Sequence, residues 1–293
     1  MSTQDPQVWF ITGSSRGFGR ALVDAVLAAG DLVVATARRP EALAADLAEY
    51  GERVLPLALD VTSPDAARAA VEAAVACFGR IDVLVNNAGY ANVSPIETTE
   101  DADFRAQFET NFWGVYHVTR AALPVLRRQG AGTVVQFSSI GGRVGGSPGI
   151  ASYQAAKFAV DGFSRVLATE TAPFGVRVMV VEPSGFATDW AGSSMTVHDV
   201  PEAYDATVGA MNRLMRQSTA GAAGDPRRAA EIIVRTVRRG EIPGHLLLGV
   251  NAATMALDHD RRRLAEASAW EKVSRSADFG EPYPVPLPTK DAV

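Results

Sequence analysis

The chain has 293 residues, 47% hydrophobic and 21% charged, which is the balance of an ordinary globular protein and allows one large domain or two small ones. Its formal net charge of −5 and the lack of a run of about 18–20 apolar residues argue against nucleic-acid and membrane partners, so we expect a soluble, cytoplasmic protein. Cys77 is the single cysteine, which excludes an internal disulfide, and Cys and His are too scattered to predict a metal site.

Short β-rich runs alternate with longer, alanine-rich helical runs through the first 250 residues. Thr62 or Ser63 can cap the helix that follows the third strand, and Pro64 suits its first turn. The predicted strands are residues 8–12, 31–36, 54–59, 81–86, 133–138, 177–182 and 246–250. The predicted helices are residues 17–29 and 40–50, one that begins near Pro64, and residues 101–128 and 152–174.

This alternation predicts a parallel sheet with helices on both faces. Because crossovers are right-handed, the expected fold class is α/β, a Rossmann-like doubly wound sheet of about seven strands. We expect residues 1–280 to form a single domain. Residues 186–224 are rich in Gly, Ser and Met and interrupt the alternation, which predicts a mobile lid with short helices. Residues 281–293 carry four prolines and predict a poorly ordered tail.

Arginines cluster at three places in the last third of the chain. Acidic residues lie among them, which favours solvated helix faces over a binding surface for an acidic partner. The clusters are Arg227 and Arg228, Arg238 and Arg239, and Arg261 to Arg263.

A glycine-rich turn follows the first strand and opens the first helix. It reads Thr12-Gly13-Ser14-Ser15-Arg16-Gly17-Phe18-Gly19. A dinucleotide phosphate lies at such a turn in this architecture, because glycine allows close backbone approach and the helix N-terminus offers N–H groups and a positive dipole end. Many turns are glycine-rich for backbone reasons alone, but the strand–turn–helix context favours a binding site.

The glycine spacing G-x-x-x-G-x-G after Thr12 resembles that of the classical short-chain dehydrogenase/reductase family. Further matches follow in order over about residues 8 to 190: Asp60, Asn86-Asn87-Ala88-Gly89, Asn111, Ser139 and Tyr153-x-x-x-Lys157. The resemblance implies an oxidoreductase that transfers a hydride between a nicotinamide cofactor and a carbonyl or alcohol. The cofactor-binding residues it implies are Gly13, Ser15, Arg16, Gly17, Phe18, Gly19, Arg38, Asp60, Val61, Asn87, Ala88, Gly89, Tyr153, Lys157, Pro183, Gly185, Phe186 and Thr188.

The end of the second strand distinguishes NAD from NADP. A carboxylate there would bind the ribose hydroxyls and repel a 2′-phosphate, but the sequence reads Ala37-Arg38-Arg39. Arg38 can bind a phosphate through its planar fork, and Arg16 can approach the same group. We therefore expect NADP(H), although both arginines could simply be exposed. Asp60 would bind the adenine amino group with Val61 against the ring, or it could cap the next helix.

The family usually has Pro-Gly-x-Val-x-Thr after the sixth strand, against the nicotinamide. This chain reads Pro183-Ser184-Gly185-Phe186-Ala187-Thr188 there. Thr188 is placed to bond the carboxamide, whereas Ser184 replaces the glycine and Phe186 the valine. Gly185 can take over the backbone role of the missing glycine.

The predicted catalytic residues are Asn111, Ser139, Tyr153 and Lys157. Tyr153 and Lys157 are four apart on a predicted helix, on one face and about 6 Å apart along the axis. An ammonium about 4 Å from the phenol would lower its pKa by up to about 3 units, so Tyr153 could exchange a proton with the substrate. The resemblance implies that Lys157 bonds the nicotinamide ribose and that Asn111 opens a water relay to it.

Ser139 would hydrogen-bond the substrate oxygen, with Ser138 as its rival. The segment from Ser139 to Tyr153 is one residue longer than is common in the family. Gly145, Gly146 and Gly149 could absorb the extra residue in the loop.

Two other functions compete with carbonyl–alcohol interconversion. One is a different reaction at the same site, such as an epimerisation or dehydration, and the other is a non-catalytic NADP(H)-binding protein. The identity of the substrate cannot be read from the sequence. Apolar residues in the approach loops and lid suggest an apolar carbonyl or alcohol, unless they pack only against the protein: Val93, Ile96, Val144, Phe186, Trp190 and Met195. The helix at 152–174 is apolar on more than one face, which predicts a homodimer or homotetramer.

Overall fold

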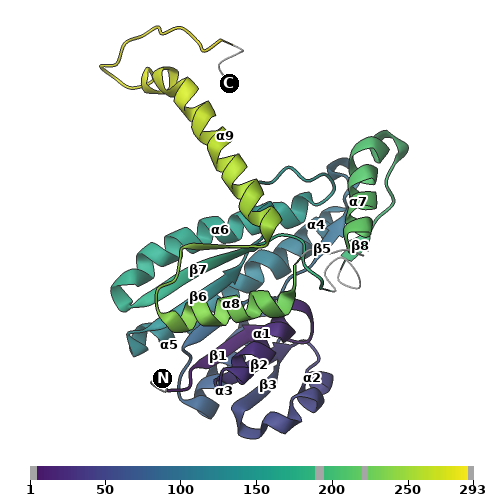
Figure 1. The fold of residues 1–293 in the computed structure, drawn as a ribbon, viewed down its shortest axis with the longest axis vertical. Coiled ribbons are helices and arrows are strands. Elements are labelled where there is room, and N and C mark those ends of the chain that lie inside the picture. Colours follow the sequence, from purple (N-terminus) through teal and green to yellow (C-terminus); the bar gives the residue numbers. More distant parts are fainter. Residues whose placement is uncertain (1–4, 189–194, 220–223, 290–293) are drawn as a thin grey trace.

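The computed structural model describes residues 5–188, 195–219 and 224–289, with the backbone alone at 216–219. Its centre is a seven-stranded parallel sheet, which confirms the predicted α/β class (Figure 1). Across the sheet the strands lie in the order β3-β2-β1-β4-β6-β7-β9. The chain starts in the middle at β1, adds β2 and β3 on one side and then β4, β6, β7 and β9 on the other, as in a doubly wound sheet. The strands are β1 Val8–Thr12, β2 Leu32–Ala37, β3 Val54–Ala58, β4 Val83–Asn86, β6 Gly132–Phe137, β7 Val176–Pro183 and β9 His245–Leu248.

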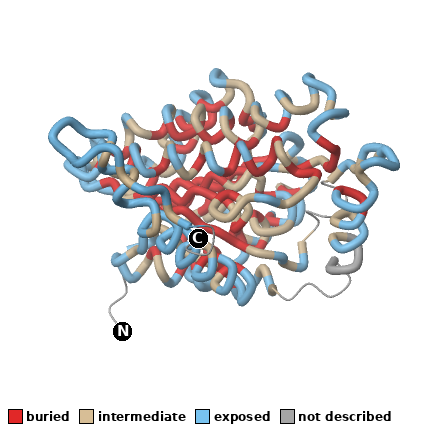
Figure 2. The backbone as a smooth tube through the Cα atoms, turned by 90° about the horizontal axis from the view of Figure 1, so that it is seen from above, coloured by how far each residue is buried: buried red, intermediate tan, exposed pale blue. Residues whose placement is uncertain are grey.

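Helices cover both faces of the sheet, and each face has its own apolar core. Successive side chains of β1 show the division: Trp9 and Ile11 belong to one core, and Val8 and Phe10 to the other. Figure 2 shows the buried residues gathered in the middle, with exposed residues around the outside. The helices are α1 Gly17–Ala28, α2 Glu41–Asp46, α3 Pro64–Phe78, α4 Asp101–Phe108, α5 Gly114–Gln129, α6 Ala151–Thr171, α7 Ala210–Thr219, α8 Pro226–Arg239 and α9 Val250–Arg275.

Helices α1 and α8 lie side by side on the first of these faces, although about 200 residues separate them in the sequence (Figure 1). Val23 and Val26 of α1 share the core with Ile233 and Val234 of α8. A buried ion pair adds to this contact, because Arg238 reaches the carboxylate of Asp31 at 2.6 Å. The arginines of the three clusters were expected to be solvated, but Arg238 instead pairs with a buried carboxylate.

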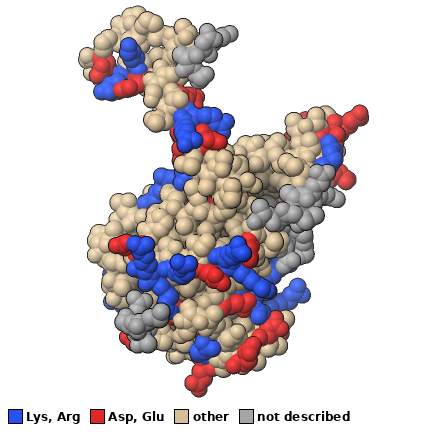
Figure 3. Space-filling view, in the orientation of Figure 1, with Lys and Arg blue, Asp and Glu red and all other residues tan. Residues whose placement is uncertain are grey.

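Charged side chains of both signs cover the outer surface of α8 and the middle and far end of α9 (Figure 3). Arg227, Arg228 and Arg239 are exposed there, as the interleaved charges predict. Arg239 lies 3.5 Å from Glu241, and Arg261 lies 3.2 Å from Asp258. These exposed pairs contribute little to stability, because water screens them.

The predicted strands agree with the structure to within two residues at either end, but two helices differ more. The helix expected at 40–50 is the short α2 followed by a 3₁₀ segment, Ala48–Arg53. The long helix expected at 101–128 contains a π-helical turn at Glu109–Trp113, between α4 and α5. Ser63, one of the two predicted caps, accepts the N–H of Ala66 at the start of α3.

Several elements lack a counterpart in the sequence-based prediction. Strands β5 (Ala91–Val93) and β8 (Met195–Val197) form a separate parallel pair, whereas α7 is one of the short helices expected in the lid. The parts of that lid at 189–194 and 220–223, with Trp190, lie outside the described residues. Helix α9 projects from the body of the molecule and buries Ala252 and Ala256 alone of its 26 residues (Figure 1).

No helix among the described residues is long and apolar enough to cross a membrane.

Candidate active site

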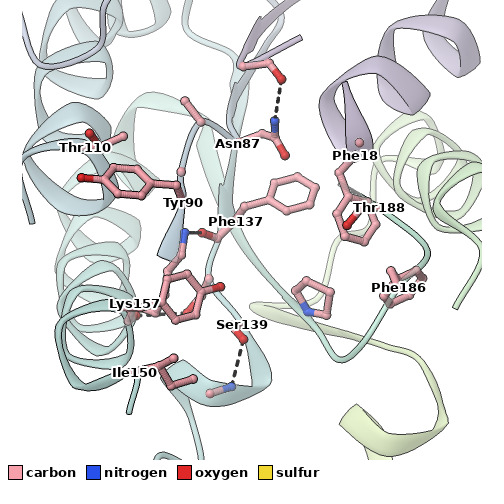
Figure 4. A pocket seen from close by; sticks show the side chains of 18 of the residues that line it. Phe18, Asn87, Tyr90, Thr110, Phe137, Ser139, Ile150, Lys157, Phe186 and Thr188 are labelled. Atoms are coloured by element: carbon pink, nitrogen blue, oxygen red, sulfur yellow. Dashed lines mark hydrogen bonds between the residues drawn. The ribbon is translucent and has the colours of Figure 1, made fainter. Parts of the chain in front are cut away.

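A cavity of about 820 Å³ lies where the carboxyl ends of β1, β2, β4, β6 and β7 meet. These ends share one edge because the strands are parallel, so residues far apart in the sequence converge there. Its size falls in the range of small-molecule and cofactor sites. Every predicted site residue except Gly19 and Asn111 lines it (Figure 4).

The glycine-rich turn forms one end of the cavity because two of its glycines have left-handed backbones. Gly13 has φ 69° and Gly17 has φ 57°. A side chain on Gly19 would collide with the Gly13 carbonyl, so Gly19 acts behind the cavity wall by letting the turn close on α1. No side chain caps the N-terminus of α1. The turn thus presents the positive end of the helix dipole to the cavity at Ser15, Arg16 and Gly17.

Thr12 joins the glycine-rich turn to the end of β4. Its hydroxyl accepts the backbone N–H groups of Asn87 (2.9 Å) and Ala88 (3.1 Å) and donates to the carbonyl of Val85. The side-chain amide of Asn87 donates in return to the carbonyls of Thr12 and Gly13. These bonds place Asn87, Ala88 and Gly89 along the cavity. Asn86 instead bonds Thr119 and Gln136, behind the site.

Two arginines line the cavity near the end of β2. Arg38 follows the last residue of the strand, and Arg16 precedes α1. Both side chains are exposed. Asp60 also lines the cavity and binds Thr62 through the Thr62 N–H (3.0 Å) and hydroxyl (2.8 Å), so it shapes the turn, while Ser63 is the helix cap.

Ser139, Tyr153 and Lys157 lie together in the opposite wall of the cavity. Figure 4 shows Ser139 and Lys157 there. The ammonium of Lys157 donates to the Phe137 carbonyl at 2.7 Å and lies 5.7 Å from the centre of the Tyr153 ring. The hydroxyl of Ser139 accepts the N–H of Gly141 at 3.0 Å, which leaves its hydrogen for an acceptor in the cavity.

Ser138 and Ser139 have different surroundings. Ser138 is buried and donates to the Lys157 backbone carbonyl at 3.1 Å, so it fastens α6 to the end of β6. Ser139, in contrast, forms a hydrogen bond with the phenol group of Tyr153. The geometry therefore favours Ser139 over its rival as the serine that can meet a substrate oxygen.

Burial dominates the ionisation of both catalytic candidates on α6. It raises the pKa of Tyr153 to about 12, and the hydrogen bond from Ser139 opposes this in part. Burial also lowers the pKa of Lys157 to about 8. The expectation of a lowered tyrosine pKa is thus wrong: the phenol is desolvated, and the ammonium bonds the Phe137 carbonyl.

Asn111 lies in the π-helical turn between α4 and α5 and is fully buried. Its amide donates to the carbonyls of Tyr90 and Gln107, both at 2.8 Å, and its oxygen accepts the Tyr90 N–H. A side chain on Gly89 would lie 2.5 Å from that oxygen and 3.6 Å from the Lys157 nitrogen. Asn111 therefore supports the strand end beside the lysine from behind the cavity wall.

Comparison of the sequence with known protein families identifies the family of this chain. A family model described as short chain dehydrogenase matches residues 7–198. The chain belongs to the short-chain dehydrogenase family. It is an oxidoreductase, of a family that binds a nicotinamide cofactor and acts on small molecules.

Relatives of this short-chain dehydrogenase match over nearly its whole length. It is 47% identical to Oxidoreductase BOA17 of Botryotinia fuckeliana (strain B05.10), over 92% of this chain and 98% of the relative. A short-chain dehydrogenase from Streptomyces avermitilis has a TM-score of 0.86 at 40% identity and covers 93% of this chain and 100% of its own. The 3-ketoacyl-(acyl-carrier-protein) reductase from Brucella melitensis, complexed with NADH, has a TM-score of 0.70 at 28% identity, with 83% and 96% covered.

The cavity of this short-chain dehydrogenase fits a nicotinamide dinucleotide. The left-handed glycines and uncapped helix end at Ser15–Gly17 suit a pyrophosphate, and Asn87 to Gly89 form the wall between that end and Lys157. Thr188 faces Gly17, with its Cβ 3.5 Å from where a Gly17 side chain would begin.

The segment after β7 departs from the family pattern, and the structure shows how. Ser184 donates its N–H to the Leu248 carbonyl at 3.1 Å, which ties the segment to β9. Gly185 adopts no left-handed φ. The Phe186 ring packs on Phe18, with centroids 4.9 Å apart, and Phe18 packs in turn on Phe137. Where the family usually has valine, Phe186 thus adds an aromatic ring to the cavity wall.

The sequence did not predict most of the residues that line the end of the cavity away from the glycine-rich turn. Several polar and apolar residues line it beyond Tyr153: Tyr90, Asn92, Ser147, Ile150, Gln154, Thr196, Met215, Asn251 and Met255. The Gln154 oxygen accepts the N–H of Ser147 at 3.2 Å and so holds the long loop after Ser139. Gly145, Gly146 and Gly149 in this loop all have left-handed φ.

Two of the apolar residues expected near the substrate line the cavity, Val144 and Phe186. Val93 and Met195 instead pack in a small core with Tyr153, and Ile96 is 75% exposed. The interpretation of these three as substrate contacts is therefore wrong. Their positions depend on the β5–β8 pair, which the sequence pattern did not reveal.

Proposed function

We propose that this short-chain dehydrogenase is an NADP(H)-dependent reductase of small, largely apolar ketones or aldehydes. One observation carries the proposal: Ser139, Tyr153 and Lys157 converge on one wall of a cavity whose other end is a dinucleotide-binding turn. A nicotinamide bound along the cavity would supply or accept the hydride.

The raised pKa of Tyr153 suits the proton-donating role that reduction of a carbonyl requires. With a pKa of about 12, Tyr153 holds its proton at neutral pH and can donate it to a carbonyl oxygen. Ser139 can turn its one hydroxyl hydrogen from the Tyr153 oxygen to the substrate oxygen, while its own oxygen still accepts the Gly141 N–H. Lys157, with a pKa of about 8, is mostly charged at pH 7 and stabilises the phenolate left after transfer. Asn111 holds the backbone beside Lys157, where a water relay could restore the proton.

The preference for NADP(H) over NAD(H) rests on the end of β2. Arg38 and Arg16 line the cavity there, and Ala37, Arg38 and Arg39 leave no carboxylate to bind the ribose hydroxyls. A guanidinium binds a phosphate by charge-assisted, bidentate hydrogen bonds. Asp60 and Val61 line the same end and suit the adenine.

The remaining proposals concern the molecule around the site. Residues 186–224 act as its lid, since Phe186, Thr196 and Met215 line the cavity. The protein forms a homodimer or homotetramer through the outer face of α6, where Phe158 and Val166 are exposed while Val160 and Leu167 face the sheet. A cytoplasmic location stays a prediction from composition, as does a single domain over 1–280 with a loose tail beyond it.

Replacing Tyr153 with Phe tests the proposal, because it removes the proton that the mechanism moves and little else. We expect the rate of NADPH oxidation with apolar ketones and aldehydes to fall at least 100-fold, with NADPH binding by fluorescence within about threefold of wild type. Tyr90→Phe is the matched control, since Tyr90 lines the same cavity outside the proposed proton path, and its rate should stay within a few-fold.

Three other outcomes would contradict parts of the proposal. Equal rates for Tyr153→Phe and wild type would remove Tyr153 as the proton carrier. Product formation without net oxidation of NADPH would favour a different reaction, such as an epimerisation. Binding of NADPH with no turnover of any carbonyl compound would favour a binding protein.

A further inference from the structure

The first half of α9 forms part of the cavity wall. Asn251 and Met255 line the cavity, whereas the next turn of the helix faces away from it. Ala252 and Ala256 hold this half against the body by packing on Ile140, which directly follows Ser139. The contact is small, because alanine side chains offer a single methyl group each.

Arg143 adds a second contact at the next turn of α9. Its Nε donates to Glu182 at 2.9 Å, and one of its terminal nitrogens lies 3.1 Å from the carboxylate of Asp260. Glu182 is 1% exposed and is the second-last residue of β7, next to Pro183. Arg143 therefore bridges the buried end of a core strand and the projecting helix, one residue after the turn Ile140–Gly142 that follows Ser139.

Glu182 belongs to a compact group of charged side chains. Its neighbours are Asp161 and His245, whose Oδ1 and Nε2 atoms lie 2.6 Å apart, and Arg165, which pairs with Asp161 at 2.8 Å. Spacing of this kind can hold a metal ion, but Arg143 and Arg165 already neutralise the two carboxylates. The group instead holds Arg143 in place through Glu182, because the buried Glu182 carboxylate would be strongly unfavourable without its arginine partner.

We propose that Arg143 is a positioning residue that holds the first half of α9 over the cavity, so that Asn251 and Met255 form the wall that discriminates among substrates. The proposal rests on the proposed function for its substrate readout. Beyond Asp260 no residue of the helix is buried against the body of the protein, and the structure describes all of residues 261–275. Small changes in the Arg143 contact should therefore change the position of the wall.

The test variant is Arg143→Met combined with Glu182→Gln, which removes the bridge without leaving a buried charge unpaired. We expect the ratio of kcat/KM for a bulky ketone to that for a small one to change by about two- to fivefold, mostly through KM, as suits one partly exposed ion pair. The Kd for NADPH should stay within twofold. The matched control is Arg165→Met, which removes another arginine of the same group that pairs within α6 and leaves α9 untouched.

Met255→Ala tests the wall itself. It should shift the same ratio toward the bulky ketone, whereas Leu257→Ala, an exposed position two residues further along α9, should not. Unchanged ratios in both the Met255 variant and the bridge variant would overturn the proposal. So would a matching shift in the Arg165→Met control, because the effect would then come from general loosening of the charged group.

Limited trypsin digestion gives a readout that needs no substrate. Cleavage after Arg261, Arg262 or Arg263 requires α9 to open locally, and the bridge variant leaves the sequence around these sites unchanged. We expect cleavage there to be about two- to fivefold faster in the bridge variant than in wild type or Arg165→Met. Equal rates would overturn the positioning role even if no ketone were turned over. Faster cleavage with unchanged selectivity would overturn the assignment of the wall.

Discussion

Lys157 is buried, with its ammonium bonded to the Phe137 carbonyl. Burial lowers its pKa from 10.5 to about 8, so the folded chain holds the proton less tightly than the unfolded chain does. The difference of about 2.5 units corresponds to roughly 3 kcal/mol that the charged lysine subtracts from stability at neutral pH. Such a cost is expected where a side chain is kept for chemistry and not for stability.

Replacing Lys157 with Met should reveal this cost through its pH dependence. Between pH 8 and 10.5 the unfolded wild-type chain binds more protons than the folded one, so wild-type stability rises with pH relative to the variant. We expect the free energy of unfolding in urea, variant minus wild type, to fall by about 2 kcal/mol between pH 7.5 and 9.5. Lys272→Met, at an exposed lysine on α9, should show no such trend. A flat difference for Lys157→Met would mean that the buried ammonium is not penalised.

Arg38 should determine the choice between the two nicotinamide dinucleotides. Arg38→Ala removes a guanidinium beside the expected 2′-phosphate, and hydrogen bonds to charged groups contribute about 1.5–3 kcal/mol. We therefore expect NADPH to bind at least about tenfold more weakly, with NADH nearly unchanged, in fluorescence titrations. Arg39→Ala is the matched control, because Arg39 is also exposed but does not line the cavity. Equal weakening for both cofactors would place the phosphate elsewhere.

At the scale of elements, the site depends on how strand ends are joined. The Thr12 hydroxyl bonds two N–H groups after β4, whereas the Thr36 hydroxyl bonds the Ile11 carbonyl, which also accepts from Ser14. Thr12→Val should therefore lower the free energy of unfolding by about 2–3 kcal/mol, and Thr36→Val by less than about 1 kcal/mol. Urea unfolding monitored by circular dichroism measures both. Similar losses would mean that the β1–β4 junction has no special role.

The same strand ends explain what could be predicted from the sequence. The glycine-rich turn, Asn87 to Gly89, Ser139 and Lys157 all lie within a few residues of a strand end or on a long amphipathic helix, so alternation and motif spacing place them. Strands buried on both faces are also apolar throughout, which makes them easy to find.

The parts that were missed have no such local signal. The π-helical turn at Asn111 has the apolar spacing of an ordinary helix, because one inserted residue barely alters the pattern. Helix α9 buries two alanines, so it has no apolar stripe to reveal it. Met255 reaches the cavity from about 100 residues beyond Tyr153, and no local pattern reports a contact of that kind.

At the scale of the whole molecule, aromatic side chains from three helices gather on one outer face. Phe112 and Trp113 precede α5 and contact Tyr116 of that helix and Phe163 of α6. Trp113 is 41% exposed and Phe158 of α6 is 43% exposed. Apolar groups of this size, exposed on neighbouring helices, are typical of a subunit interface.

Placing charge on this face should dissociate the proposed oligomer. We expect Phe158→Lys combined with Val166→Asp to convert a dimer or tetramer into smaller species at micromolar concentration, as measured by light scattering after size exclusion. Ile96→Lys, at an exposed apolar residue in the loop before α4, should leave the mass unchanged. A monomeric mass for the wild-type protein would exclude the oligomer altogether.

The pairing of α1 with α8 also has a consequence for biosynthesis. Strands β1 to β4 and their helices have been synthesised after about 90 residues, but Ile233 and Val234, which cover Val23 and Val26, come nearly 150 residues later. Until then the apolar side of α1 faces solvent or a chaperone, at synthesis rates of about 5–20 residues per second. The Arg238–Asp31 pair can likewise form only at this late stage. The half of the molecule that carries the glycine-rich turn is therefore translated first but completed only after α8 has been made.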